Sequence, residues 1–162
     1  MSYESSQRFL LKALHEVGSD LAGQFYGLAA GELDARDRDG WSLRQVLCHL
    51  RDAEAQFLDQ VEGILHERAA REPVLRCVNL DLLVVERDYD SADMGETLGE
   101  YRWLRTRSCY ALADAWGTDW ERTGRHPYRG SLTLAEIVRE MNEHDLEHVW
   151  QVRRIRDGAL RR

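Results

Sequence analysis

The sequence predicts an all-α protein in which four long amphipathic helices form one four-helix bundle. The chain of 162 residues contains only two prolines, Pro73 and Pro127, so long stretches carry no helix breaker. Leu, Ala, Glu and Arg are plentiful, and all four favour helices. Apolar residues recur at steps of three and four along four segments. We therefore expect helices and loops without a sheet, in one domain that spans residues 1–162.

The first helix is predicted to run from about Ser5 to Ala30. Its apolar positions repeat at helical spacing with charged residues between them, and they are Leu10, Leu14, Val17, Leu21, Phe25 and Leu28. Gly31 is expected to close this helix, and the charged residues that follow, up to Gly40, should form a loop.

The second helix should begin at a capping box, in which Ser42 is followed three residues later by Gln45. No breaker follows until about Ala70. The apolar stripe of this segment consists of Val46, Leu50, Ala53, Phe57, Val61 and Ile64. His49 lies near one border of the stripe, and a border position faces a neighbouring helix.

A long connection from Arg71 to Asp90 should join the second and third helices. It contains an apolar run, LDLLVV at residues 80–85, that could form one or two helical turns or a strand. We prefer the helix, because a lone strand would have no partner.

The third helix is predicted from about Ser91 to Trp116, with Gly117 at its end. One side of it carries Leu98, Tyr101, Leu104, Ser108 and Leu112. A loop over residues 117–131 then leads to the fourth helix. Four long amphipathic segments with one long middle connection are typical of a four-helix bundle, whose facing helices are a common place for a metal site.

The fourth helix carries the most informative pattern in the chain. A second capping box, Thr133 with Glu136, marks its start. The residues that share its apolar face are Leu134, Ile137, Met141, His144, His148, Val152 and Ile155. Two imidazoles therefore point into an apolar face, one helical turn apart. Each must find a hydrogen-bond partner or a metal there, and the residues alone leave both readings open.

A metal site would need a further ligand from a neighbouring helix. In such a bundle His49 can face His144 and His148, which would place three neutral imidazoles around one divalent ion. Three protein ligands and one open position are the arrangement of catalytic zinc sites, and the open position can bind water or substrate. Gln151 falls near the same sector and is a candidate pocket residue.

The acidic residues beside the two histidines allow two interpretations. Asp145 and Glu147 could accept hydrogen bonds from the ring N–H groups, or they could form a solvated helix flank, which is the simpler reading. The string HDLEH also matches the H-x-x-E-H motif of inverted zinc proteases. No Glu follows it in the chain to supply the acidic ligand, which argues against a protease.

The remaining histidines and Cys48 have simpler readings. His15 and His66 are expected to be exposed on helices. His126 precedes Pro127 in a loop and is read as a packed loop residue, although it could approach the mouth of the site. Cys48 is read as core packing, with a nucleophile as the alternative because it adjoins His49.

Composition excludes several classes of partner. The formal net charge of −7 provides no general field that would attract nucleic acid or anionic lipid. The three cysteines include no C-x-x-C pair, which suits a reducing compartment. The N-terminal residues lack an apolar leader, and no run approaches the ~20 apolar residues of a membrane span. We expect a cytoplasmic protein without nucleic-acid or membrane partners.

Three stretches resemble the DinB/YfiT-like superfamily of four-helix metalloproteins. They are WSLRQVLCHL at 41–50, RTGRHPYRGSLTL at 122–134 and HDLEHVWQ at 144–151. The resemblance covers nearly the whole chain, and it implies an up-down-down-up topology with the long crossover between the second and third helices. It also implies His49, His144 and His148 as three metal ligands, a divalent ion such as zinc, nickel, iron or manganese, and a homodimer.

The resemblance implies function less specifically. Some related members are transferases or isomerases that use a low-molecular-weight thiol such as bacillithiol, mycothiol or glutathione, and others are regarded as hydrolases. Our first interpretation is a metal-dependent enzyme whose three-histidine site activates a thiol or water against a small electrophilic substrate. The alternative is a non-catalytic, stress-related dimeric bundle with a structural or empty metal site. A coordination position that water can reach would favour the enzyme.

Overall fold

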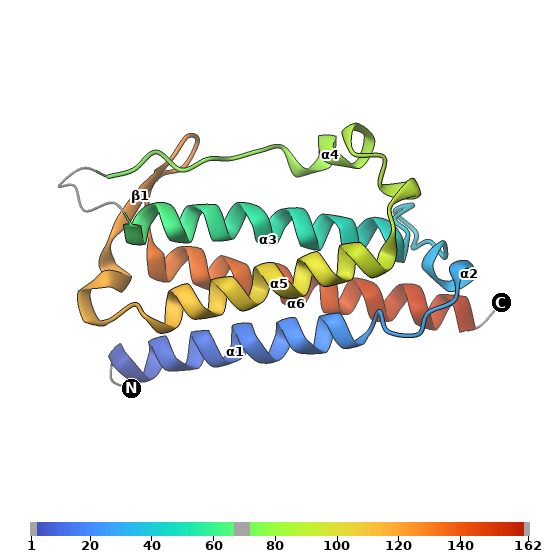
Figure 1. The fold of residues 1–162 in the computed structure, drawn as a ribbon, viewed down its shortest axis with the longest axis horizontal. Coiled ribbons are helices and arrows are strands. Elements are labelled where there is room, and N and C mark those ends of the chain that lie inside the picture. The colour runs from blue at the N-terminus through green and yellow to red at the C-terminus, as the bar shows by residue number, and fades with distance from the viewer. Residues whose placement is uncertain (1–2, 67–71, 161–162) are drawn as a thin grey trace.

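Four long helices form the bundle that the sequence predicts (Figure 1). The computed structural model describes residues 3–66 and 72–160. The bundle consists of α1 (Tyr3–Gly23), α3 (Leu43–His66), α5 (Met94–Ala113) and α6 (Leu134–Leu160). The chain runs one way along α1 and α6 and the opposite way along α3 and α5, which confirms the up-down-down-up topology. Within the described ranges, no helix is long and apolar enough to cross a bilayer.

The packing order of the helices decides which of them can share a site. Helix α6 packs against both α1 and α3, and α5 likewise packs against both α1 and α3. The parallel pairs are therefore α1 with α6 and α3 with α5, and the long crossover that joins α3 to α5 runs along one side of the bundle (Figure 1). Side chains of α3 and α6 meet directly, as a site built from the second and fourth long helices requires.

The two predicted capping boxes are present. The Ser42 hydroxyl accepts from the Gln45 N–H at 3.1 Å, and the Gln45 side-chain oxygen accepts from the Ser42 N–H at 3.2 Å. At the start of α6, the Thr133 hydroxyl accepts from the Glu136 N–H at 3.1 Å and the Glu136 carboxylate accepts from the Thr133 N–H at 2.7 Å. These reciprocal bonds satisfy backbone donors that the first helical turn leaves free.

The first predicted helix is too long at its C-terminal end. Helix α1 stops at Gly23, because turns over residues 21–26 follow it and Gly27 adopts a φ of +71°. A short helix α2 (Ala30–Leu33) then contains Gly31, which was expected to end a helix. The predicted second helix ends at His66 in the structure, and its last predicted residues, 67–70, lie outside the described residues.

The sequence correctly predicted helical structure in the crossover and in the third helix, but it misplaced both ends of the third helix. The LDLLVV run forms α4 (Leu80–Glu86), as predicted, and a single 3-10 turn η1 (Tyr89–Ser91) follows. Helix α5 begins at Met94 because the Asp93 side chain accepts from the Glu96 N–H at 2.8 Å. It ends at Ala113, three residues before the predicted end.

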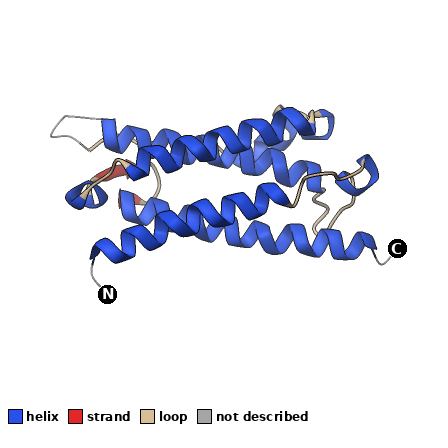
Figure 2. Cartoon of the chain, turned by 60° about the horizontal axis from the view of Figure 1, so that its bottom comes forward, coloured by secondary structure: helices blue, strands red, loops and turns tan. Residues whose placement is uncertain are grey.

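The expectation of no sheet was wrong. After a 3-10 helix η2 (Gly117–Glu121), strands β1 (Thr123–His126) and β2 (Gly130–Thr133) form an antiparallel hairpin at one end of the bundle (Figure 2). The strands are only four residues long, too short for a clear alternation. The crossover adds pairing, since the Leu75 N–H donates to the Arg125 carbonyl at 3.0 Å. Gly124 allows this approach, because a Cβ there would lie 2.4 Å from a Leu75 methyl carbon.

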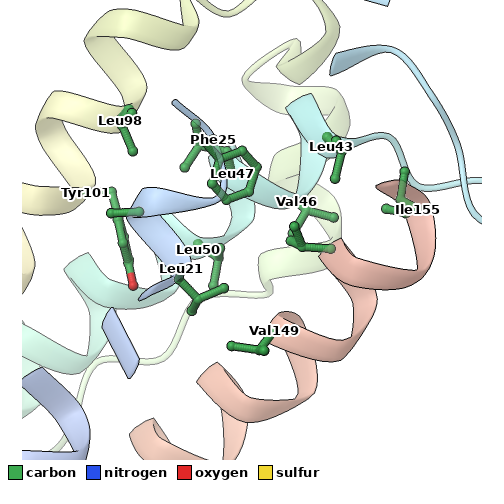
Figure 3. Close-up of a cluster of buried hydrophobic side chains, with 12 residues drawn as sticks. Leu21, Phe25, Leu43, Val46, Leu47, Leu50, Leu98, Tyr101, Val149 and Ile155 are labelled. Carbon is green, nitrogen blue, oxygen red and sulfur yellow. The ribbon is translucent and has the colours of Figure 1, made fainter. Parts of the chain in front are cut away.

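Two hydrophobic clusters fill the bundle, one towards each end. The first cluster, drawn in Figure 3, contains Leu21, Ala22, Phe25, Leu43, Val46, Leu47, Leu50, Leu98, Tyr101, Val149, Val152 and Ile155. The second contains Leu14, Val61, Ile64, Leu75, Leu112, Trp120, Leu132, Leu134, Ile137, Val138 and Met141. Each draws on all four long helices. Between them lies a buried polar layer.

Arg105 is the centre of that polar layer. Its guanidinium, with a side chain only 8% exposed, donates at 2.6 Å to Glu54 of α3 and at 2.6 Å and 3.1 Å to Asp145 of α6. It also donates to the Leu14 carbonyl of α1 at 2.9 Å. Ser108 donates to the other Glu54 oxygen at 2.6 Å. One α5 side chain therefore binds the other three long helices.

We predict that removing the Arg105 charge strongly destabilises the fold. Arg105→Met keeps much of the side-chain volume but leaves two buried carboxylates without their partner, which costs about 3–5 kcal/mol. The free energy of unfolding in urea measures the loss. The control Arg107→Met breaks the half-exposed pair with Glu62 and should cost less than about 1 kcal/mol. Equal effects of the two substitutions would contradict the role given to Arg105.

Candidate metal centre

The structure brings the three predicted histidines together between α3 and α6. The Nε2 atoms of His49 and His144 lie 3.1 Å apart, and those of His144 and His148 lie 3.2 Å apart. One ring nitrogen from each of the three lies within 4.8 Å of the others. His144 and His148 come from successive turns of α6, and His49 faces them from α3, so the site depends on the contact between these two helices.

Aromatic side chains of α3 and of the turn before it hold the imidazoles in place. Trp41 packs edge-on against His49, with ring centroids 5.6 Å apart, and Phe57 packs edge-on against His144 at 5.8 Å. Each of these two residues lies eight positions from His49 along the chain, one on either side. The sequence analysis placed Phe57 in the apolar stripe of its helix and gave Trp41 only as the first residue of the stretch at 41–50, and it connected neither to the site.

Gln151 contacts a histidine through its amide. The Gln151 Oε1 atom lies 2.8 Å from His148 Nδ1, and its Nε2 atom donates to the Asp37 carboxylate at 3.0 Å. A hydrogen bond from His148 Nδ1–H to Gln151 leaves the lone pair on Nε2, the atom that faces the other two imidazoles. Asp37 was not predicted as part of the site, since it lies in the charged loop before α3.

Burial keeps all three imidazoles neutral at physiological pH. Desolvation, with a smaller contribution from the charge of His148, lowers the pKa of His49 to about 4. Desolvation also lowers the pKa of His144 to about 3, assisted by the other two histidines and by Arg105. The pKa of His148 is lowered by burial too, against the opposing effect of the hydrogen bond that its ring donates to Gln151. Neutral imidazoles are the form that binds metal ions.

The donor set fits a divalent cation better than it fits a hydrogen-bonded histidine cluster. Without a cation, His144 Nε2 has either one proton or one lone pair, yet the Nε2 atoms of both His49 and His148 face it. A cation satisfies three lone pairs at once. Nitrogen ligands about 2.0–2.1 Å from a tetrahedral zinc ion lie about 3.3 Å from one another, close to the observed 3.1 Å and 3.2 Å separations.

The three histidines keep some exposure to solvent. Each is partly buried, in contrast to the adjacent Asp145, which is 2% exposed. A catalytic site needs such exposure, because substrate must reach the metal ion.

The two acidic neighbours of the histidines, Asp145 and Glu147, lie in different environments. Asp145 matches neither predicted role, because it is buried against Arg105 instead of holding a ring N–H or lying in solvent. Glu147 is exposed on the helix flank, as the simpler reading expected. Arg105 was the sequence feature that could have indicated a buried partner for Asp145. It lies on the same helical face as Tyr101, Ser108 and Leu112.

The other three histidines and Cys48 do not belong to the histidine cluster. His15 and His66 are exposed on α1 and α3, as expected. His126 lies in β1, where its Nδ1 accepts from the Tyr128 N–H at 3.2 Å, and it is not part of the histidine cluster. Cys48 is completely buried, and burial raises the pKa of its thiol. Both features oppose a nucleophilic role and confirm the packing interpretation.

Comparison with known proteins connects this geometry to a family. The sequence pattern of the DinB superfamily matches residues 13–152. The chain belongs to the DinB superfamily. A relative from Oceanobacillus iheyensis, whose name proposes a metal-dependent hydrolase, is 29% identical over 122 residues, which cover 73% of this chain and 69% of the relative.

A solved structure shows the same fold. YfiT from Bacillus subtilis is described as a probable metal-dependent hydrolase with an unusual four-helix bundle topology. It superposes on this DinB protein with a TM-score of 0.83 at 23% identity, and the match covers 99% of this chain and 89% of YfiT. At this level of identity the likeness establishes the fold.

We predict that the metal-free protein loses stability on acidification, in part through His144. The pKa of this imidazole is about 3 in the folded chain and 6.5 as the reference value. Between these values the unfolded chain binds a proton that the folded chain does not, so stability is greatest above about pH 6.5 and falls as the pH decreases.

The substitution His144→Gln should therefore flatten the dependence of the unfolding free energy on pH between about pH 6.5 and pH 4. Urea unfolding at several pH values in a metal chelator measures this slope. The control His15→Gln makes the same substitution at an exposed position of α1, and its slope is compared with that of His144→Gln. A His144→Gln slope equal to that of the wild type would show that His144 is not held neutral.

Proposed function

We propose that this DinB protein is a metal-dependent enzyme that uses His49, His144 and His148 to hold one divalent ion and acts on a small electrophilic substrate. The observation that supports this most directly is the convergence of ring nitrogens from three partly exposed histidines. The relative from Oceanobacillus iheyensis, whose name proposes a metal-dependent hydrolase, supports the same class of chemistry.

A bound divalent ion would supply a Lewis acid that acidifies a water or thiol and polarises the bond under attack. The protein provides the setting for that chemistry. Three neutral ligands leave the positive charge of an ion undiminished, whereas carboxylate ligands would reduce it. Trp41 and Phe57 fix the rings of His49 and His144, and Gln151 fixes that of His148.

Hydrolysis is the first activity to test, and thiol transfer is the second. Both need the same open coordination position and differ only in the nucleophile that occupies it. Cys48, next to His49 in the chain, is a free thiol that is buried away from solvent. A thiol-dependent reaction would therefore take its thiol from a small-molecule co-substrate.

The non-catalytic alternative is the weaker proposal. A purely structural zinc site is normally closed by four protein ligands. Here, among residues 3–66 and 72–160, three histidines form the group, and they are partly exposed. The homodimer stays a prediction, which size-exclusion chromatography with light scattering can test.

We predict about one divalent ion per chain in protein purified without chelators or a histidine tag. His49→Ala and His144→Ala should each lose it, because two imidazoles bind a divalent ion far more weakly than three. Inductively coupled plasma mass spectrometry measures the metal content. The matched control is His66→Ala, which removes an exposed imidazole from the last turn of α3 and should retain the ion. Retention of the ion by His144→Ala would contradict the ligand assignment.

We predict that the zinc- or manganese-loaded protein hydrolyses small activated esters or amides and that His148→Ala reduces the rate to background. The assay is run with and without a low-molecular-weight thiol. A rate that is independent of thiol supports a hydrolase, whereas consumption of the thiol with the substrate supports a transferase. No turnover by metal-loaded protein in either arm, across a broad substrate panel, would favour the non-catalytic bundle.

A further inference from the structure

We propose that Asp37, in the loop before α3, sets the tautomer of His148 through Gln151 and thereby controls metal affinity. The inference rests on the proposed metal site and adds a positioning residue that touches neither the ion nor the substrate. Its physical basis is a chain of two hydrogen bonds, from Gln151 to Asp37 at 3.0 Å and between His148 and Gln151 at 2.8 Å.

The loop holds the Asp37 carboxylate in one orientation. Its Oδ1 atom accepts from the N–H groups of Asp39 at 2.9 Å and Trp41 at 2.8 Å. The Asp37 N–H donates to the Trp41 carbonyl at 2.9 Å, and Gly40, with a φ of +86°, completes the turn. With Oδ1 occupied by two backbone donors, Oδ2 is the atom that faces Gln151.

Hydrogen-bond chemistry then fixes each later step. A carboxylate only accepts, so Gln151 must turn its NH2 group towards Asp37. Its carbonyl oxygen is thereby directed at His148 Nδ1, and this oxygen also only accepts. His148 Nδ1 must therefore carry the proton, which leaves Nε2 with the lone pair that a metal ion needs. Asp37 is the fixed end of the chain because the backbone of its own loop anchors it.

The same atoms predict an unusual effect for the isosteric substitution Asp37→Asn. The loop N–H groups require an acceptor, so the Asn oxygen must stay at the Oδ1 position and its NH2 group must face Gln151. Gln151 then reverses to offer its oxygen to Asn, and its own NH2 group faces His148 Nδ1. That contact favours the tautomer with the proton on Nε2, which cannot bind a metal ion.

Four variants separate the tautomer from charge and loop structure. Asp37→Asn and Asp37→Ala remove the same negative charge, but only Asn forces Gln151 to reverse. Asp39→Asn makes the same charge change at an exposed position of the same loop. The double variant Asp37→Asn with Gln151→Glu restores the chain, because a Glu carboxylate accepts both from the Asn NH2 group and from His148 Nδ1–H.

The experiment measures the zinc dissociation constant of each variant by competition with a chromophoric chelator. We expect about 10–100-fold weaker binding for Asp37→Asn, the usual effect of losing a partner of a metal-bound histidine. Asp37→Ala should lose less affinity than Asp37→Asn, although it damages the loop more. Asp39→Asn should bind as the wild type does, and the double variant should recover most of the lost affinity.

A second readout reports the tautomer directly. Nitrogen-15 NMR of histidine-labelled, metal-free protein distinguishes a protonated Nδ1 from a protonated Nε2. His148 should be protonated on Nδ1 in the wild type and the double variant, and on Nε2 in Asp37→Asn. If Asp37 had a purely structural or electrostatic role, its substitution would not move the proton of His148 from Nδ1 to Nε2. Thermal unfolding of the metal-free variants checks that the fold is retained.

The outcomes distinguish this inference from the proposed function. If the wild type binds no zinc, the metal site itself is wrong. If the wild type binds zinc and Asp37→Asn binds it equally well, or if Asp37→Ala loses more affinity than Asp37→Asn, the role of Asp37 is overturned. The same conclusion follows if His148 keeps its proton on Nδ1 in Asp37→Asn.

Discussion

The buried guanidinium of Arg105 is the constraint on which the arrangement of this bundle depends. It donates hydrogen bonds to Leu14 of α1, Glu54 of α3 and Asp145 of α6 while belonging to α5. A buried charge is strongly destabilising without its partners, so the four helices must keep the rotation that brings these groups together. Gly18 belongs to the same constraint, because a Cβ there would lie 2.6 Å from the Arg105 guanidinium.

This polar layer also positions the histidine cluster. Asp145 follows His144 directly in α6, and Glu54 lies five residues after His49 in α3, so the residues that bind Arg105 are close in sequence to the ones that face one another as ligands. Fixing α3 against α6 through Arg105 fixes the separation of the imidazoles. The hydrophobic clusters on either side of the layer supply the burial energy, whereas the ion pairs define one rotation for each helix.

A second set of contacts comes from the loop before α3. Within a few residues this loop and the start of α3 supply Asp37, which binds Gln151, Trp41, which packs on His49, and the capping residue Ser42. The loop therefore contacts the site through both α3 and α6. The histidines are thus supported from the buried side by the Arg105 layer and from the end of the bundle by this loop, and they remain partly exposed.

The sequence by itself determined the parts of this protein that depend on local interactions. Helix type follows from apolar spacing, the starts of α3 and α6 from reciprocal bonds between residues three apart, and the pair of inward imidazoles from the one-turn spacing of His144 and His148. The border position of His49 on its helix made it the candidate third ligand, and the resemblance to a known family implied the same ligand and the topology. All of these signals lie within one or two helical turns, or in motifs that can be matched directly.

Only the tertiary structure decided the parts that depend on distant residues. Gln151 meets Asp37 across 114 residues and Arg105 meets Glu54 across 51, and no periodicity reports such pairs. The hairpin was missed because its four-residue strands are stabilised partly by the crossover segment at Leu75. Asp145 was misread because a carboxylate next to a histidine looks solvent-exposed until a buried arginine from another helix is seen to pair with it. Local chemistry determines which helices form, and long-range pairing of polar groups determines how they are rotated and what their side chains can bind.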